Sequence, residues 1–176
     1  MSPDSGAPAE LAEAFVEALT ADHERAGFRC GVAELDQYFR RQAGRDAAKH
    51  LAAVFVLALE DGTVAGYYTL SSATLFLPDL LGASRRRTSR YPQMPAAKLS
   101  RLAVDKRFRK RGYGRLLLAD ALCRVRSSSF SSVALIAEAG GETAREFYKR
   151  EGFLIFPDRP DMFFRPMADI AALFAA

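Results

Sequence analysis

The sequence has no tryptophan and only two cysteines and two histidines in 176 residues. Cys30 and Cys123 stand 93 positions apart, which fits neither a disulfide framework nor a zinc ligand set. No His-Glu-x-x-His or Cys-x-x-Cys motif occurs, so we expect no metal. No apolar run approaches the roughly 20 residues of a membrane span, and the first residues are acidic where a secretion signal is basic. We therefore expect a protein of the reducing cytoplasm with no membrane attachment.

The composition excludes a disordered or collagen-like chain, because 49% of the residues are hydrophobic and 11% are aromatic. The length favours one compact domain. We expect residues 1–9, which are rich in Pro, Ser and Ala, to form a flexible tail, and residues 10–176 to form the domain.

Positive charge is concentrated in one part of the chain, although the formal net charge is only +4. Residues 85–126 hold 14 Lys and Arg against 2 Asp and Glu, whereas the segments on either side are both net acidic. Such a block indicates a polyanionic partner, either nucleic acid or a phosphate-rich cofactor. A solvated basic surface that only aids solubility is the alternative.

Hydrophobic periodicity predicts helices alternating with strands. Helices are expected over residues 10–20, 32–45, 114–126 and 142–150. Strands are expected over residues 53–59, 64–71, 98–104, 133–139, 155–156 and 162–165, with a connection over 78–96. This order predicts an α/β (α+β) fold with one mixed central sheet flanked by helices.

A glycine-containing basic run, Arg109-Lys110-Arg111-Gly112-Tyr113-Gly114, lies between a predicted strand and a predicted helix. Glycine lets the backbone turn sharply and approach a ligand, and the amides at a helix start attract anions. The P-loop pattern is excluded because no Gly-Lys-Ser/Thr follows. The dinucleotide fingerprint is excluded because the third glycine is missing. The pattern that remains is Arg/Gln-x-x-Gly-x-Gly/Ala.

That pattern resembles the pyrophosphate loop of the GNAT N-acetyltransferase superfamily. Residues 101–105, 109–114 and 116–122 together look like its acetyl-CoA-binding core, and residues 144–153 resemble its closing Ala-x-x-Phe-Tyr-x-x-x-Gly-Phe element. Residues 28–31, 35–38 and 66–70 are similar to the GNAT toxins of bacterial toxin–antitoxin pairs, which acetylate the amino acid on aminoacyl-tRNA. The resemblance covers residues 19–164.

The resemblance also implies differences from the local patterns. It implies a first strand near residues 15–19, where the composition alone predicts a helix. Ser100 stands where many of these toxins have glycine, and Ala139-Gly140-Gly141 replaces a more usual Asp-Ala turn.

The resemblance implies that Tyr148 is the general acid, which protonates the leaving thiolate of CoA. Packing of its ring against the core is the alternative. It further implies an acetyl-CoA site. The backbone of Leu102, Ala103 and Val104 would hold the pantetheine arm and the acetyl oxygen, and Arg109, Lys110, Arg111, Gly112, Tyr113, Gly114 and Arg115 would hold the pyrophosphate.

We assign no general base. The α-amine of an aminoacyl ester is more acidic than a lysine amine, so a base is less necessary for that acceptor. The residues considered for this role are His23, His50, Glu138 and Glu142, all of which are more often surface or structural residues.

A second basic cluster consists of Arg85, Arg86, Arg87 and Arg90, with Tyr91 beside it. These arginines would contact tRNA phosphates, and the tyrosine would stack on a base. A solvated loop is the alternative.

These observations predict an N-acetyltransferase that works by direct attack of an amine on acetyl-CoA, with the α-amine of aminoacyl-tRNA as acceptor. Two alternatives remain open, namely a GNAT enzyme that acts on a small amine or a protein amino group, and a non-catalytic nucleic-acid-binding module. The resemblance implies acetyl-CoA, aminoacyl-tRNA, a small ribbon-helix-helix antitoxin and a second copy of the chain as partners.

Overall fold

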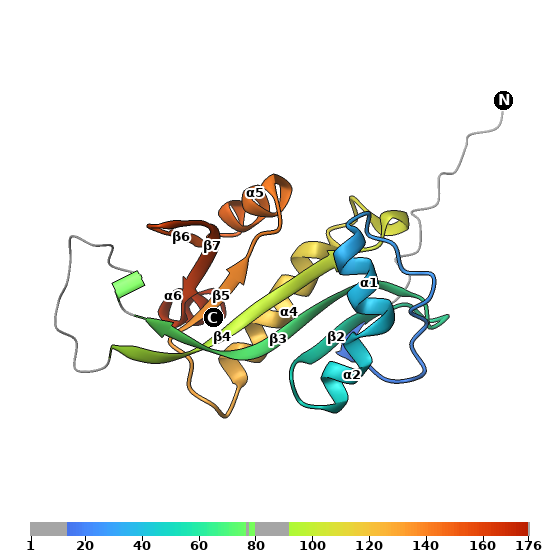
Figure 1. Ribbon diagram of the computed structural model, residues 1–176, viewed down its shortest axis with the longest axis horizontal. Helices are drawn as coiled ribbons and strands as arrows, with labels where there is room; N and C mark the ends of the chain where they lie inside the picture. The colour runs from blue at the N-terminus through green and yellow to red at the C-terminus, as the bar shows by residue number, and fades with distance from the viewer. Residues whose placement is uncertain (1–13, 77, 80–91, 176) are drawn as a thin grey trace.

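All strands join in one seven-stranded sheet in the computed structural model, which describes residues 14–76, 78–79 and 92–175. Their order across the sheet is β1, β2, β3, β4, β5, β7, β6. The strands are β1 (Phe15–Ala18), β2 (Ala53–Ala58), β3 (Val64–Phe76), β4 (Gln93–Val104), β5 (Ala134–Glu138), β6 (Leu154–Phe156) and β7 (Arg159–Pro166). Neighbouring strands are antiparallel except β4 and β5, which run parallel at the centre of the sheet (Figure 1).

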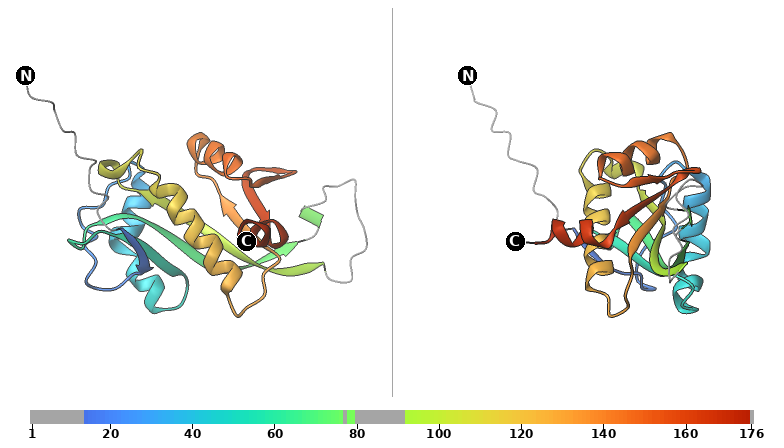
Figure 2. Two further views of the ribbon diagram at one scale, coloured as in Figure 1. Left: turned by 180° about the vertical axis from the view of Figure 1, so that it is seen from behind. Right: turned by 90° about the vertical axis from the view of Figure 1, so that its left-hand side faces the viewer.

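Helices cover both faces of the sheet, as Figure 2 shows end-on. The helices are α1 (Ala33–Arg41), α2 (Ala43–Ala48), α4 (Tyr113–Ser127), α5 (Glu142–Arg150) and α6 (Met167–Leu173). The first two lie on one face, whereas α4 and α6 lie on the other. The expected mixed sheet flanked by helices is confirmed.

Strand β3 packs against the helices on both faces of the sheet, because its consecutive side chains point to opposite faces. The rings of Tyr67 and Tyr68 are both fully buried. The Tyr67 hydroxyl donates to the Leu35 carbonyl of α1, 2.8 Å away, and the Tyr68 hydroxyl donates to Asp120 of α4. A buried tyrosine usually places its hydroxyl where it can form such a hydrogen bond.

The helix predicted over residues 10–20 is wrong where the structure describes it, because Phe15–Ala18 is strand β1. This strand pairs with β2 along its whole length, from Phe15 opposite Ala58 to Ala18 opposite Phe55. Helix propensity differs by only a few tenths of a kcal/mol between these residue types and alanine, so pairing at the sheet edge overrides it. The first strand that the family resemblance implied is therefore correct.

The single helix predicted over residues 32–45 is also wrong. At Gln42 the φ angle widens to −117°, with ψ −34° still in the right-handed region, and α1 ends and α2 begins around this residue. Residues 93–96 belong to β4 rather than to the predicted connection, since Phe76 pairs with Gln93 at the far end of the hairpin. Helix α6 has no counterpart in the sequence prediction.

Gly66 is required where β3 passes beneath α4. A Cβ atom there would lie 2.8 Å from the Ala103 carbonyl oxygen and 2.8 Å from the Leu117 side chain. We therefore expect Gly66→Ala to lower the free energy of unfolding by about 1–3 kcal/mol, the usual cost of overpacking a core. Urea unfolding measures this. Gly27→Ala is the matched control, because nothing lies within 4 Å of a Cβ atom at Gly27. Equal stability of the two variants would contradict the close approach.

Candidate active site

The two central parallel strands part halfway along β4. They pair only from Ala97 opposite Leu135 to Leu99 opposite Ala137. Just beyond, Ser100 is an extra residue in the pairing of β4 with β3, a β-bulge that bends the strand. The next residues of β4 still pair with β3 but have no β5 neighbour on the other side. Their outward backbone N–H and C=O groups are therefore available to a ligand in the opening.

This opening lies where the sequence placed the backbone contacts of Leu102, Ala103 and Val104. The side chains of Leu102 and Val104 pack against the core below α4, and Ala103 is buried in the cluster below α1. The side chains thus hold the strand while its backbone stays free at one edge. Core packing thus occupies the side chains and leaves the backbone groups for the ligand contacts that the sequence predicts.

The basic glycine run forms a loop between β4 and α4. A short 3-10 helix η1, Lys106–Phe108, is capped by Asp105, and the loop then turns through two residues with positive φ, Lys110 at 61° and Gly112 at 78°. Gly112 is the N-cap of α4 in the left-handed conformation that glycine adopts without strain. The first amides of α4 thus follow the turn directly, at the positive end of the helix dipole.

Gly114 brings three elements of the site together. A Cβ atom at Gly114 would lie 3.7 Å from the ring of Phe147 on α5 and 4.0 Å from Val104 at the end of β4. The start of α4, the free end of β4 and α5 therefore meet at this residue. Figure 1 shows α5 beside the opening between the parted strands.

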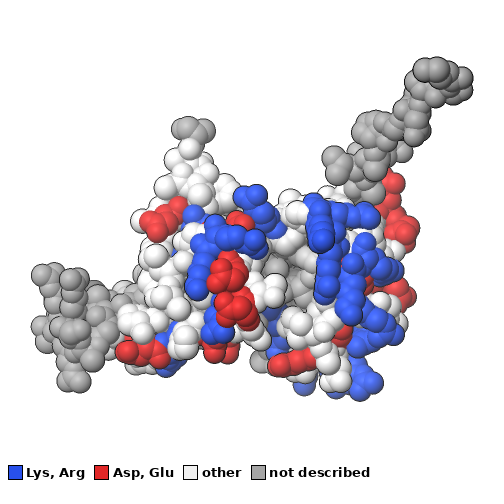
Figure 3. Space-filling view, turned by 90° about the horizontal axis from the view of Figure 1, so that it is seen from above, with Lys and Arg blue, Asp and Glu red and all other residues white. Residues whose placement is uncertain are grey.

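The basic side chains of the loop have different tasks. Arg109 donates to the Cys30 carbonyl and so ties the loop to the segment before α1. Arg115 pairs with Glu151 at 3.0 Å, at the end of α5. Lys110, Arg111 and Arg115 are exposed, with the Arg111 guanidinium 5.3 Å from the centre of the Phe108 ring. In Figure 3, Lys and Arg gather on the side where α1 and this loop lie, and the surface is recessed between them and α5.

Two buried carboxylates that the sequence analysis did not identify hold the same segment. Asp36 of α1 accepts the Cys30 amide at 2.7 Å, and Asp105 accepts the Arg29 amide at 3.0 Å. Burial alone would raise the pKa of Asp105, but hydrogen bonds from Arg107 and from the Arg29 amide lower it below its usual value. The sequence gives no signal for Asp105, because its partner Arg29 is 76 positions away in the chain.

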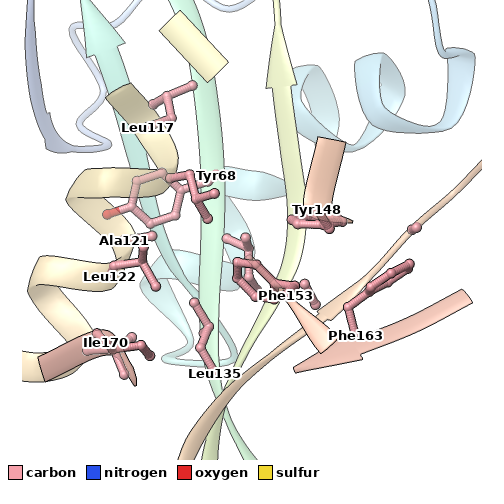
Figure 4. Packing of buried hydrophobic residues seen from close by; sticks show 14 of the residues in the cluster. Tyr68, Leu117, Ala121, Leu122, Leu135, Tyr148, Phe153, Phe163 and Ile170 are labelled. Atoms are coloured by element: carbon pink, nitrogen blue, oxygen red, sulfur yellow. The ribbon is translucent and has the colours of Figure 1, made fainter. Parts of the chain in front are cut away.

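Tyr148 lies on α5 within the main core cluster, only 4% exposed. Its ring centre is 5.2 Å from that of Phe153 and 5.9 Å from that of Phe163. Figure 4 shows these three residues on one side of the cluster, with Leu117, Ala121 and Leu122 of α4 on the other. Burial raises the pKa of Tyr148, so its hydroxyl keeps its proton well above neutral pH.

The four residues considered as a general base are two histidines, near β1 and α2, and two glutamates, at the end of β5 and the start of α5. His23 is buried beside β1, where its Nδ1 accepts the Thr20 amide at 2.9 Å, so its Nε2 donates to Glu17 at 2.7 Å. His50 is exposed just after α2. Glu138 ends β5 at the opening and pairs with Lys98 at 3.0 Å, whereas Glu142 begins α5 and pairs with Arg145 at 2.7 Å.

Nucleophilic catalysis by Cys30 and metal binding have little support in the described residues. Burial and a hydrogen bond to Asp36 raise the pKa of the Cys30 thiol to about 11, so it is not a thiolate nucleophile at neutral pH. Among residues 14–76, 78–79 and 92–175, no group of three or more His, Cys, Asp or Glu is placed to hold a metal ion. No helix within those ranges is long and apolar enough to cross a membrane.

The predicted tail and the cluster of Arg85, Arg86, Arg87 and Arg90 lie outside the described residues.

Sequence comparison finds matches along most of the chain. The model of the acetyltransferase (GNAT) family matches residues 12–153. The "Probable toxin TacT" of Sinorhizobium fredii is 32% identical over 173 residues, which make up 92% of this chain and 96% of the relative. The "tRNA-acetylating toxin" of Mycobacterium tuberculosis is 34% identical over 148 residues, 83% of this chain and 87% of the relative.

Solved structures share the fold over the same span. AtaT complexed with acetyl-methionyl-tRNAfMet is similar with a TM-score of 0.83 and 28% identity, over 93% of this chain and 100% of that chain. A tyrosine-to-phenylalanine variant of AtaT, bound to the C-terminus of the antitoxin AtaR and to acetyl-CoA, gives a TM-score of 0.80 and 27% identity, over 93% and 99% of the two chains.

The loop geometry makes Gly114 a test of the anion site. A glutamate there adds a negative charge where the pyrophosphate of acetyl-CoA is expected, and its Cβ makes only ordinary contacts with Phe147 and Val104. We expect Gly114→Glu to weaken acetyl-CoA binding at least tenfold, about 1.4 kcal/mol, without unfolding the protein. Calorimetric titration measures the affinity.

Gly114→Ala is the matched control, because it adds the Cβ atom without the charge. A folded Gly114→Glu variant with unchanged affinity would remove the loop from the cofactor site.

Proposed function

The chain belongs to the GNAT acetyltransferase family, and on that premise we propose that it transfers the acetyl group of acetyl-CoA to the α-amine of aminoacyl-tRNA. One observation carries the proposal: the unpaired end of β4, the helix-start amides of the loop and the helix that carries the buried phenol meet at Gly114. Acetyl-CoA carries its pyrophosphate far from the carbon that reacts, so its site needs an anion-binding loop, an edge for the arm between them and an acid for the leaving thiolate.

The residues present fit acetyl-CoA. The loop amides at Tyr113 and Gly114, with the exposed Lys110 and Arg111, would neutralise the pyrophosphate. The free backbone groups of Leu102 to Val104 would bind the amide-rich pantetheine arm as an added strand does. A backbone N–H at the end of that edge would polarise the acetyl carbonyl and stabilise the negative charge that forms on its oxygen.

We propose Tyr148 as the general acid. The amine attacks the acetyl carbonyl, so a C–N bond forms, the C–S bond breaks, and the amine releases a proton to solvent. The Tyr148 hydroxyl gives its proton to the departing thiolate and regains one from solvent. Burial raises the pKa of Tyr148, so the phenol is protonated at the working pH, as a general acid must be. The protonated Cys30 thiol supports direct attack rather than an acyl-cysteine intermediate.

The relatives support aminoacyl-tRNA as the acceptor. One is named a tRNA-acetylating toxin, and AtaT has been solved with acetyl-methionyl-tRNAfMet. The basic side chains over α1 and the loop suit a polyanion. The ordinary α-amine is already partly neutral near pH 7.7, so Glu138 and Glu142 need not act as bases. A product with a blocked α-amine would make the protein a translation-inhibiting toxin.

We also propose an antitoxin partner, since AtaT has been solved with the C-terminus of AtaR. Charged tRNA and acetyl-CoA as substrates, together with two free cysteines, favour the cytoplasm as the place of action.

Tyr148→Phe tests the chemistry. It keeps the buried ring and deletes the acid, so we expect kcat to fall about 100-fold with little change in acetyl-CoA affinity. Because burial raises the pKa of Tyr148, the wild-type kcat should show no loss of an acid as the pH rises to about 10, the ordinary pKa of tyrosine. Release of CoA thiol, followed against pH, measures both.

Tyr68→Phe is the control, because it deletes a buried hydroxyl bound to Asp120 outside the site and should cost stability rather than kcat. Near-normal turnover of Tyr148→Phe would return that residue to a packing role.

The acceptor is tested by following radiolabelled acetyl from acetyl-CoA into charged tRNA. Deacylated tRNA should bind but accept no label, because only the aminoacylated form has the amine. Label in small amines or protein instead would favour the general acetyltransferase. If the protein neither binds acetyl-CoA nor releases CoA thiol, a non-catalytic nucleic-acid-binding module is favoured.

A further inference from the structure

A second basic site lies away from the parted strands, at the far end of α1. A surface hollow of about 650 Å³ is bounded by the chain after β1, the end of α1 and one side of α2. Its lining includes Gly44 and three arginines, Arg25, Arg41 and Arg45, and no acidic residue.

The three guanidiniums come from different segments. Arg25 precedes α1, Arg41 is the last residue of α1, and Arg45 lies in α2. Within the described ranges none of the three forms an ion pair with a carboxylate. Uncompensated cations around one concave surface attract an anion.

Gly44 makes room for one of these arginines. A Cβ atom at Gly44 would lie 3.0 Å from Nη1 of Arg25, so the guanidinium lies directly over the backbone of α2. The same nitrogen donates to the Phe39 carbonyl at 3.4 Å, which holds the side chain near the hollow. Glycine inside a helix is otherwise unfavourable compared with alanine, and here it allows the approach of Arg25.

Compensation of helix dipoles explains only part of the cluster. Arg41 and Arg45 stand in the last turns of α1 and α2, where a cation is favourable. Arg25 belongs to neither helix, yet it converges on the same hollow.

We propose that this hollow binds backbone phosphates of the tRNA acceptor, an inference that rests on the proposed function. Helix α1 connects the two sites: its first turn follows Gly31, which lies against Lys106 and Arg109 of the loop, and its last residue is Arg41. Nine residues of helix span about 13 Å. A single acceptor that fills both the opening and the hollow must therefore be extended, as aminoacyl-tRNA is, whereas a small amine reaches only the first site.

The test compares two variants with the same change in net charge. Arg41→Ala with Arg45→Ala removes two positive charges from the hollow. Arg126→Glu makes the same change on the exposed part of α4, on the opposite face of the sheet. Binding of deacylated tRNA is measured between about 50 and 200 mM salt, because each lost phosphate contact flattens the salt dependence by nearly one logarithmic unit. Transfer of acetyl to charged tRNA and to a free amino-acid methyl ester is measured alongside.

We expect the double variant to lose nearly two units of salt slope and to raise KM for charged tRNA about tenfold. Its kcat, its acetyl-CoA affinity and its rate with the methyl ester should match wild type, and Arg126→Glu should match wild type throughout. An unchanged slope and KM in the double variant, or no binding of tRNA by the wild type, would overturn the inference. If tRNA binding depends on the two arginines but charged tRNA accepts no acetyl group, the phosphate site in the hollow is supported and the proposed function is contradicted.

Discussion

The separation of β4 from β5 is the constraint on which the rest of the site depends. Parallel strands normally satisfy each other's backbone groups along their length, but β4 and β5 pair only as far as Leu99, next to the bulge at Ser100. The freed edge of β4 would be costly if it were covered by apolar side chains, because unpaired backbone groups must find partners. In the proposed function, the amide-rich pantetheine arm would supply these partners. The strand itself stays in place because β3 still pairs with its other edge.

Charge in this protein is divided between holding the fold and attracting ligands. Arg109 and the buried acids Asp36 and Asp105 bind the segment before α1 to the loop after β4. That arrangement fixes the helix-start amides of α4 relative to the parted strands. Lys110 and Arg111 stay exposed on the same loop. A mutation of a basic residue here therefore tests binding only if the residue is not one of those that hold the loop.

Local patterns sufficed where an element has a strong signal of its own. The helix over Glu142–Arg150 has the predicted bounds, and the glycine run lies between a strand and a helix as expected. The signal failed where propensity is weak. Residues 15–18 form a strand because β2 offers them hydrogen bonds, and the predicted helix over residues 32–45 breaks at Gln42. Neither partner nor break is visible from the composition of the segment itself.

The sequence by itself determined the family, through short motifs whose residues are neighbours in the chain: the basic glycine loop and the run that contains Tyr148. Only the tertiary structure decided how far the site extends. The contact of Gly114 with Val104 and Phe147, and the grouping of Arg25 with Arg41 and Arg45, join residues that are distant in the chain. Such contacts depend on strand register and helix packing, which arise from burial of the whole core rather than from any one segment.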